Sequence, residues 1–166
     1  MNGAPPYFMP LDTRRQTLHL ARRLAACLRP SDLVILSGEL GAGKTFLVRG
    51  LCRALGLSER VRVTSPTFSL VHEIKTQLML LHADLYRLGT AHEVRDLGLL
   101  SRRDEGCVLL VEWGEPWMQE LGGDALVVWL SARPRQARLV SNGPRSGDML
   151  AQLQASGQNA QVVKEP

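Results

Sequence analysis

Several features are scarce in this 166-residue chain, and each shortage excludes a class of protein. The three cysteines, Cys27, Cys52 and Cys107, are odd in number and far apart. Without a Cys-x-x-Cys pair or Cys/His ligand spacing, they support neither a disulfide framework nor a zinc site, and we expect reduced thiols in the core. No apolar run is long enough to span a bilayer, and the first 15 residues lack the basic and apolar regions of a signal peptide. We therefore expect a cytoplasmic protein with no membrane association.

The chain also lacks a dense basic run. Lys and Arg number 20 against 16 Asp and Glu, so the formal net charge is +4, and the positive residues are mostly scattered arginines. This mild excess suits an anionic ligand or a nucleic-acid partner, and it equally suits simple solubility. With 45% apolar residues, the chain has the composition of an ordinary globular protein whose length fits one domain.

Apolar periodicity predicts interleaved helices and strands. A helix is expected over residues 13–28, capped by Asp12 or Thr13 and ended by Pro30. Another follows the glycine-rich stretch and ends at Gly56. Interleaving of this kind predicts an α/β fold with a mixed, partly parallel sheet flanked by helices in three layers. Strands are expected at 32–37, 66–74, 78–86, 107–113, 125–132 and 136–142, and short helical segments at 90–103 and 115–123.

The stretch Gly38-Glu39-Leu40-Gly41-Ala42-Gly43-Lys44-Thr45 matches the phosphate-binding pattern GxxxxGK[ST]. Glycines permit the positive φ angles that turn several backbone amides toward one group of phosphate oxygens, and the following helix points its positive end at the same place. Lys44 adds a charge for the β- and γ-phosphates, and the Thr45 hydroxyl is a ligand for Mg²⁺. The flanking apolar strand and amphipathic helix strengthen the prediction of a P-loop that binds ATP and Mg²⁺ through residues 38–46, Phe46 included.

A second acidic group is expected beside the metal. In the run "CVLLVEW", Glu112 follows five apolar residues, and a carboxylate there is costly to bury without a cation or metal partner. Glu112 is therefore either the second magnesium ligand or a strand-end glutamate in solvent. Trp113 beside it either stacks on the adenine ring or lies in the core.

Polar residues elsewhere are candidates for hydrolysis. Ser65 and Thr67 flank a proline, either in a loop that senses the γ-phosphate or in an ordinary Ser-Pro turn. Asp84 either orients or deprotonates the attacking water, with Lys44 and Arg87 balancing charge, or caps a turn. His82, two residues earlier, is expected to be structural.

These motifs together resemble the bacterial TsaE (YjeE) family. The resemblance rests on "GELGAGKT", "SPTF" (Ser65–Phe68), "HADLYRL" (His82–Leu88), "VEW" and "RQAR" (Arg135–Arg138), and covers about residues 10 to 140. After "VEW" the family often continues with proline, whereas this chain has Gly114.

The resemblance implies a small, slow ATPase that acts with TsaB and TsaD to form N6-threonylcarbamoyladenosine at position 37 of tRNAs reading codons that begin with A. It makes tRNA an indirect partner through the complex. It assigns Mg²⁺ to Thr45 and Glu112, the adenine to Trp113, and further nucleotide contacts to Arg135 and the segment around Thr13. Asp84 is the residue most needed for hydrolysis, with Thr67 or Ser65 on a switch loop.

The expected organisation is an extended arm at residues 1–12, one ATPase domain at 13–142, and a polar tail at 143–166 that is either a frayed helix or disordered. Two other functions are compatible with a P-loop. One is a small-molecule kinase, for which residues 87–105 are the only candidate lid. The other is a nucleotide-gated assembly factor for which hydrolysis is not essential.

Overall fold

The computed structural model describes residues 5–162, and their side chains as far as residue 157. The strands are β1 Tyr7–Pro10, β2 Leu33–Ser37, β3 Val71–Lys75, β4 Met79–Asp84, β5 Val108–Glu112, β6 Ala125–Ala132 and β7 Arg135–Ser141. The helices are α1 Arg14–Cys27, α2 Lys44–Ala54, α3 Ala91–Asp96, α4 Leu99–Asp104 and α5 Pro144–Val162, with a 3₁₀ turn at Glu115–Trp117.

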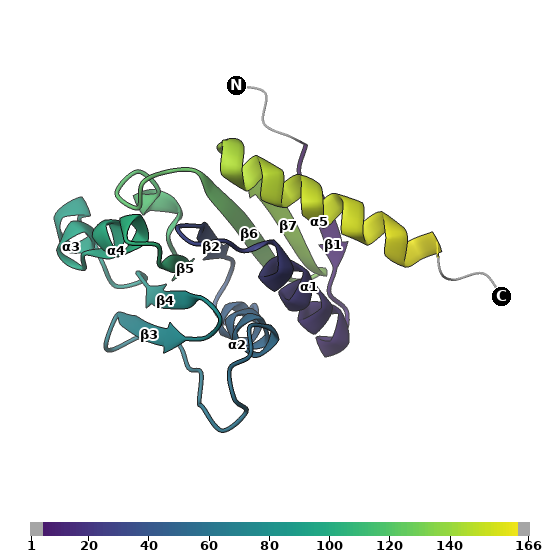
Figure 1. Ribbon diagram of the computed structural model, residues 1–166, viewed down its shortest axis with the longest axis horizontal. Coiled ribbons are helices and arrows are strands. Elements are labelled where there is room, and N and C mark those ends of the chain that lie inside the picture. The colour runs from purple at the N-terminus through teal and green to yellow at the C-terminus, as the bar shows by residue number, and fades with distance from the viewer. Residues whose placement is uncertain (1–4, 163–166) are drawn as a thin grey trace.

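The strands form one sheet in the order β1-β7-β6-β2-β5-β4-β3 (Figure 1). Its four central strands, β6, β2, β5 and β4, are parallel, whereas β1, β7 and β3 pair antiparallel at the two sides. Leu36 and Asp84 both pair with Glu112, so the carboxyl ends of β2, β4 and β5 meet at one edge. Loops at such an edge are where ligands bind in open parallel sheets.

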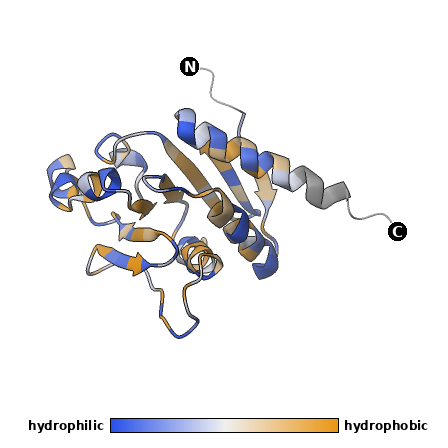
Figure 2. Cartoon of the chain, viewed as in Figure 1, coloured by the Kyte–Doolittle hydropathy of each residue, from blue (hydrophilic) through white to orange (hydrophobic). Residues whose placement is uncertain are grey.

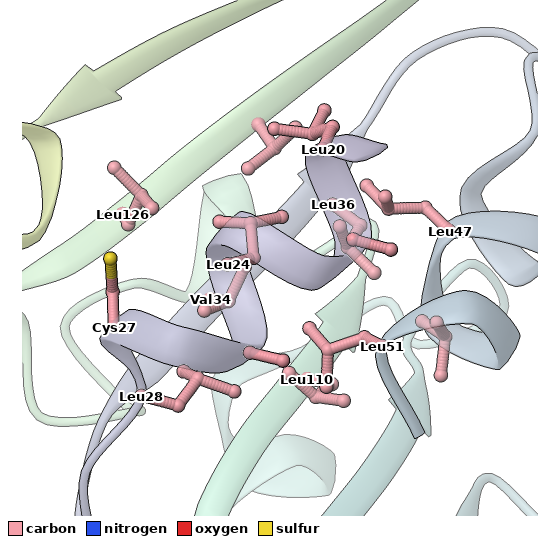
Figure 3. Close-up of a cluster of buried hydrophobic side chains, with 14 of the residues drawn as sticks. Leu20, Leu24, Cys27, Leu28, Val34, Leu36, Leu47, Leu51, Leu110 and Leu126 are labelled. Carbon is pink, nitrogen blue, oxygen red and sulfur yellow. The ribbon is translucent and has the colours of Figure 1, made fainter. Parts of the chain in front are cut away.

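Two apolar cores lie on opposite faces of the sheet, which makes the fold three-layered. α1, α2 and α5 cover one face, where Leu20 and Leu24 pack near Leu47 and Leu110 (Figure 3). α3 and α4 contribute to the smaller core on the other face. Figure 2 shows predominantly hydrophobic central strands, and alternating hydrophobic and hydrophilic residues along α1 and α5. That alternation is typical of helices with one face in a core. The sheet with helices on both of its faces confirms the expected α/β class.

Several predicted element boundaries are confirmed. Thr13 caps α1 by accepting from the Gln16 amide, and the Gln16 side chain accepts from the Thr13 amide in return. Thr90 caps α3 in the same way with Glu93. No helix within residues 5–162 combines the length and apolarity needed to cross a membrane.

Of the two alternatives for residues 143–166, a frayed helix and a disordered tail, the disordered tail is wrong for residues 144–162. Residues 144–162 form α5, and Leu150 and Leu153 are fully buried against the sheet. Residues 163–166 lie outside the described residues. Arg145 fixes the start of α5 through two bonds of 2.7 and 2.8 Å to the buried Asp32 carboxylate. The residue composition of the tail is polar, but its larger apolar side chains within the described residues, Met149, Leu150 and Leu153, are all buried.

Three other expectations need correction. The N-terminal arm, of which residues 1–4 are not described, is not separate from the domain, because β1 pairs with β7 at the sheet edge. The strand expected over 66–74 is only β3, since residues 67–70 form a turn in which Leu70 has a φ of +64°. The helical segment at 90–103 is divided between α3 and α4 at Gly98, whose φ is +66°.

Candidate nucleotide site

The loop between β2 and α2 folds back on itself through left-handed glycines. Gly38, Gly41 and Gly43 have φ angles of +128°, +80° and +106°. A Cβ atom on Gly38 would lie 2.1 Å from the carbonyl oxygen of Leu130, so no other residue fits there without movement. At Gly41 and Gly43 a Cβ atom would enter open space. The loop thus forms a concave stretch of backbone around the start of α2.

The first backbone amides of α2 make no hydrogen bond within the described residues. Its N-cap, Gly43, has no side chain to accept them, and the amides of residues 43–46 donate to no other group in the described part of the chain. The first bond of this end runs from the Leu47 amide to the Gly43 carbonyl at 2.9 Å. Free amides and the helix dipole together give this loop a partial positive charge suited to an anion.

Lys44 lies across the loop and adds a full charge to it. Its ammonium donates to the carbonyl oxygens of Gly38 at 2.7 Å and Glu39 at 2.9 Å, and it lies 4.4 Å from the ring centroid of Trp113. Burial lowers the pKa of Lys44, and nearby carboxylates, that of Glu112 foremost, oppose this shift. The lysine is therefore held at the centre of the concave loop.

Glu112 ends β5 beside the first turn of α2. Its carboxylate is 4% exposed, and Oε1 accepts from the Thr45 hydroxyl at 2.9 Å. The same oxygen lies 2.9 Å from Nε2 of the buried His82. The alternative of a glutamate in solvent is therefore wrong, and the hydroxyl and carboxylate predicted as magnesium ligands are neighbours.

Asp84 ends β4 on the same edge and is 7% exposed. Its Oδ2 accepts from the Ser65 hydroxyl at 2.8 Å, and its Oδ1 from the Tyr86 amide at 3.1 Å. Thr67 donates in turn to the Ser65 oxygen at 3.3 Å. The 65–67 segment is therefore linked by hydrogen bonds to the carboxylate predicted to act in hydrolysis.

A cavity of about 370 Å³ joins these groups. Thr13 and Arg135, by contrast, do not line it: Thr13 caps α1, and the Arg135 guanidinium donates to the Leu11 carbonyl at 3.2 Å. Arg14, next to Thr13, does approach the site, with its guanidinium 5.9 Å from the ring centroid of Phe46. The cavity is lined by Leu40, Gly41, Gly43, Lys44, Thr45, Phe46, Ser65, Thr67, Asp84, Tyr86, Arg87, Glu112 and Trp113.

Trp113 separates this cavity from a second one of about 480 Å³. It has a φ of +60°, rare for a bulky residue, and its ring lies 5.0 Å from that of Tyr86. The second cavity also reaches Gly38 and Glu39 of the loop, and it contains the aromatic rings of Phe8 and Trp129. Sequence reasoning missed these two rings, because only the pairing of β1, β7 and β6 brings them to the loop.

Comparison with known proteins identifies the family of this chain. The family model described as threonylcarbamoyl adenosine biosynthesis protein TsaE matches residues 11–140, which is most of the chain. The chain belongs to the TsaE family. This family takes part in tRNA threonylcarbamoyladenosine biosynthesis, and the match spans the sheet from α1 to β7.

Curated TsaE proteins are similar over much of the chain. The protein named tRNA threonylcarbamoyladenosine biosynthesis protein TsaE of Streptomyces coelicolor is 52% identical over 112 residues, which are 64% of this chain and 73% of that relative. Its namesake in Rickettsia conorii is 36% identical over 132 residues, or 79% and 74% of the two chains. The crystal structure of Bacillus subtilis YdiB shares the fold, with a TM-score of 0.71 at 24% identity over 95% of this chain and 99% of that one.

Proposed function

We propose that this chain is the magnesium-dependent ATPase subunit of a complex that threonylcarbamoylates adenosine 37 of tRNAs reading ANN codons, acting with TsaB-like and TsaD-like proteins. Membership of the TsaE family supports the tRNA pathway. The single observation that carries the nucleotide part is the uncapped start of α2, where free amides, the Lys44 ammonium and the Glu112 carboxylate surround one cavity.

The residues present fit a magnesium-nucleotide complex. The loop offers amide donors and one ammonium to phosphates, and its glycines leave open space on the concave side. Mg²⁺ is usually held by one or two protein oxygens together with phosphates and waters, and the Thr45 hydroxyl and Glu112 carboxylate supply such a pair. When bound, the ion neutralises charge on the β- and γ-phosphates.

Asp84 is the group we propose to orient the attacking water. It lies in the same cavity as Lys44, and its carboxylate is directed by the Ser65 hydroxyl and the Tyr86 amide. A carboxylate held by two donors keeps one orientation, which suits alignment of a water in line with the leaving oxygen. Ser65 donates to this carboxylate and Thr67 donates to the Ser65 oxygen, so the 65–67 segment can respond to the occupant of the cavity.

We assign the base to the side of Trp113 away from Asp84. The indole forms a wall of the second cavity, into which Phe8 and Trp129 also project, and aromatic rings provide stacking surfaces for a purine. The edge groups of this cavity include the Glu115 carboxyl, whose pKa is raised by burial.

The test separates binding from turnover. Lys44→Ala should abolish Mg-ATP binding measured by calorimetry. The control is Lys75→Ala, which removes an exposed lysine on β3 and should not alter this binding. Asp84→Asn should bind Mg-ATP and lose hydrolysis measured by phosphate release, alone and with the two partners. Normal hydrolysis by Asp84→Asn would contradict the catalytic assignment. Partner association that needs ATP but survives in Asp84→Asn would favour a nucleotide-gated assembly factor.

A further inference from the structure

His82 is a buried polar residue in a place where an apolar one would pack. Its side chain is 0% exposed, on β4, between the apolar strand β5 and β3. Alternation along the strands puts His82 and Asp84 on the same face of the sheet as Glu112, beneath the first turn of α2. Burial of an imidazole costs free energy that a leucine or valine would not.

The hydrogen bond of His82 has a fixed direction. Nε2 lies 2.9 Å from Oε1 of Glu112, and an ionised carboxylate only accepts, so the proton is on Nε2. Nδ1 has no partner in the described part of the chain. Within the described residues, the contact with Glu112 is therefore the only hydrogen bond of the imidazole.

The two oxygens of Glu112 consequently differ. Oε1 accepts from both His82 and Thr45, whereas Oε2 accepts from no group within residues 5–157. Two donors on one oxygen lock the rotamer of the carboxylate, and the remaining oxygen belongs to a residue that lines the loop cavity. This arrangement resembles the outer shell of metal sites, where a second residue orients a ligand.

We propose that His82 is a positioning residue that holds Oε1 of Glu112 and so presents Oε2 to the magnesium ion. The inference rests on the proposed function, since it needs Glu112 to be a metal ligand. It extends that function to a residue whose expected role was structural packing.

The experiment measures magnesium dependence of nucleotide binding in the full chain. A fluorescent N-methylanthraniloyl-ADP is bound to wild type, His82→Leu and His82→Gln, and MgCl₂ is titrated, with a parallel measurement in EDTA. We expect His82→Leu to raise the half-saturating magnesium concentration about tenfold or more, with unchanged affinity in EDTA. His82→Gln should recover much of the loss, because its amide reaches as far as Nε2.

A double-mutant cycle distinguishes positioning from packing. In a Glu112→Gln background, His82→Leu should have no further effect on the magnesium curve. An equal loss in both backgrounds, or a change in EDTA affinity alone, would overturn the inference. If His82→Leu does not fold in thermal unfolding, His82→Asn replaces it, because its amide is too short to reach Glu112 while His82→Gln spans the gap.

The control separates this inference from the function beneath it. If Glu112→Gln leaves the magnesium curve unchanged, the metal assignment fails and the inference with it. A large effect of Glu112→Gln beside none for His82→Leu overturns the role of His82 alone.

Discussion

The N-termini of α2 and α5 differ in what their free amides meet. At α5 each early amide has a partner within the protein: Pro144 has no N–H, and the Arg145 and Ser146 amides donate to the Asp124 carboxylate at 2.9 and 2.8 Å. The Gly147 amide donates to the Gly143 carbonyl at 2.9 Å. At α2, the amides of residues 43–46 donate to nothing in the described part of the chain.

The charges of the side chains around the two helix N-termini also differ. At α5 an acidic residue, Asp124, complements the positive end of the helix. At α2 the first turn contains no acidic residue and instead adds a cation, Lys44. An ordinary helix end is stabilised by hydrogen bonds within its own chain, whereas the first amides of α2 have no partner in the described part of the chain, which suits the anion that we propose binds there.

The largest expected effect on stability comes from adding a side chain at Gly38, the first glycine of the loop before α2. Gly38→Ala would place a Cβ atom 2.1 Å from the Leu130 carbonyl oxygen at a φ of +128°, so we expect a loss of about 3 kcal/mol or more in the free energy of unfolding. Gly147→Ala, in α5, meets no atom within 4 Å and should raise stability by about 0.5 kcal/mol. Urea denaturation of both variants checks this, and equal effects would contradict the tight fit at Gly38.

A smaller effect should appear when the α2 amides receive a ligand. With Mg-ADP at ten times its dissociation constant, local exchange of the amides of residues 43–46 should slow about tenfold, equivalent to about 1.4 kcal/mol. Exchange at residues 145–147, already bonded to Asp124 and Gly143, should not change. Hydrogen exchange followed by mass spectrometry measures both segments in one sample. Equal slowing at the two ends would indicate global stabilisation and remove the contrast between them.

The contrast also explains which features were predictable. The α2 end is encoded locally: glycines at 38, 41 and 43 provide the left-handed backbone, and Lys44 and Thr45 follow in the same stretch. Glu112 was predictable because a carboxylate after five apolar residues is conspicuous. In each case, a short run of sequence contains its own physical reason.

The position of α5 depends on contacts between residues far apart in the sequence, so it was not predicted. Its cap, Asp124, precedes it by 20 residues, and Arg23 on α1 donates to the Leu153 carbonyl and to Ser156. The polar composition of the tail concealed the apolar spacing of Leu150 and Leu153. The contact between His82 and Glu112 was not predictable for a similar reason, since the two residues are 30 apart in the sequence.

The smallest effect, with a defined pH dependence, concerns the α5 cap. Burial raises the pKa of Asp124, but bonds from the Ser146 and Arg145 amides outweigh it and hold the folded-state pKa below the ordinary value of 3.8. Such a carboxylate stabilises the fold fully above the unfolded-chain pKa and loses this contribution as the pH falls through the lower folded value. Asp124→Ala should therefore cost about 1 kcal/mol near neutral pH.

That cost should shrink on acidification below pH 3.8. Asp104→Ala, at an exposed position on α4 whose carboxylate accepts no hydrogen bond within residues 5–157, is the matched control and should show neither effect. Urea denaturation between neutral pH and pH 3 measures the difference. A constant cost across that range would mean that the Asp124 side chain stabilises the fold by packing against Gly143 and not through its charge. The two residues are in close contact, because a Cβ atom added to Gly143 would lie 2.4 Å from the Asp124 carboxyl carbon.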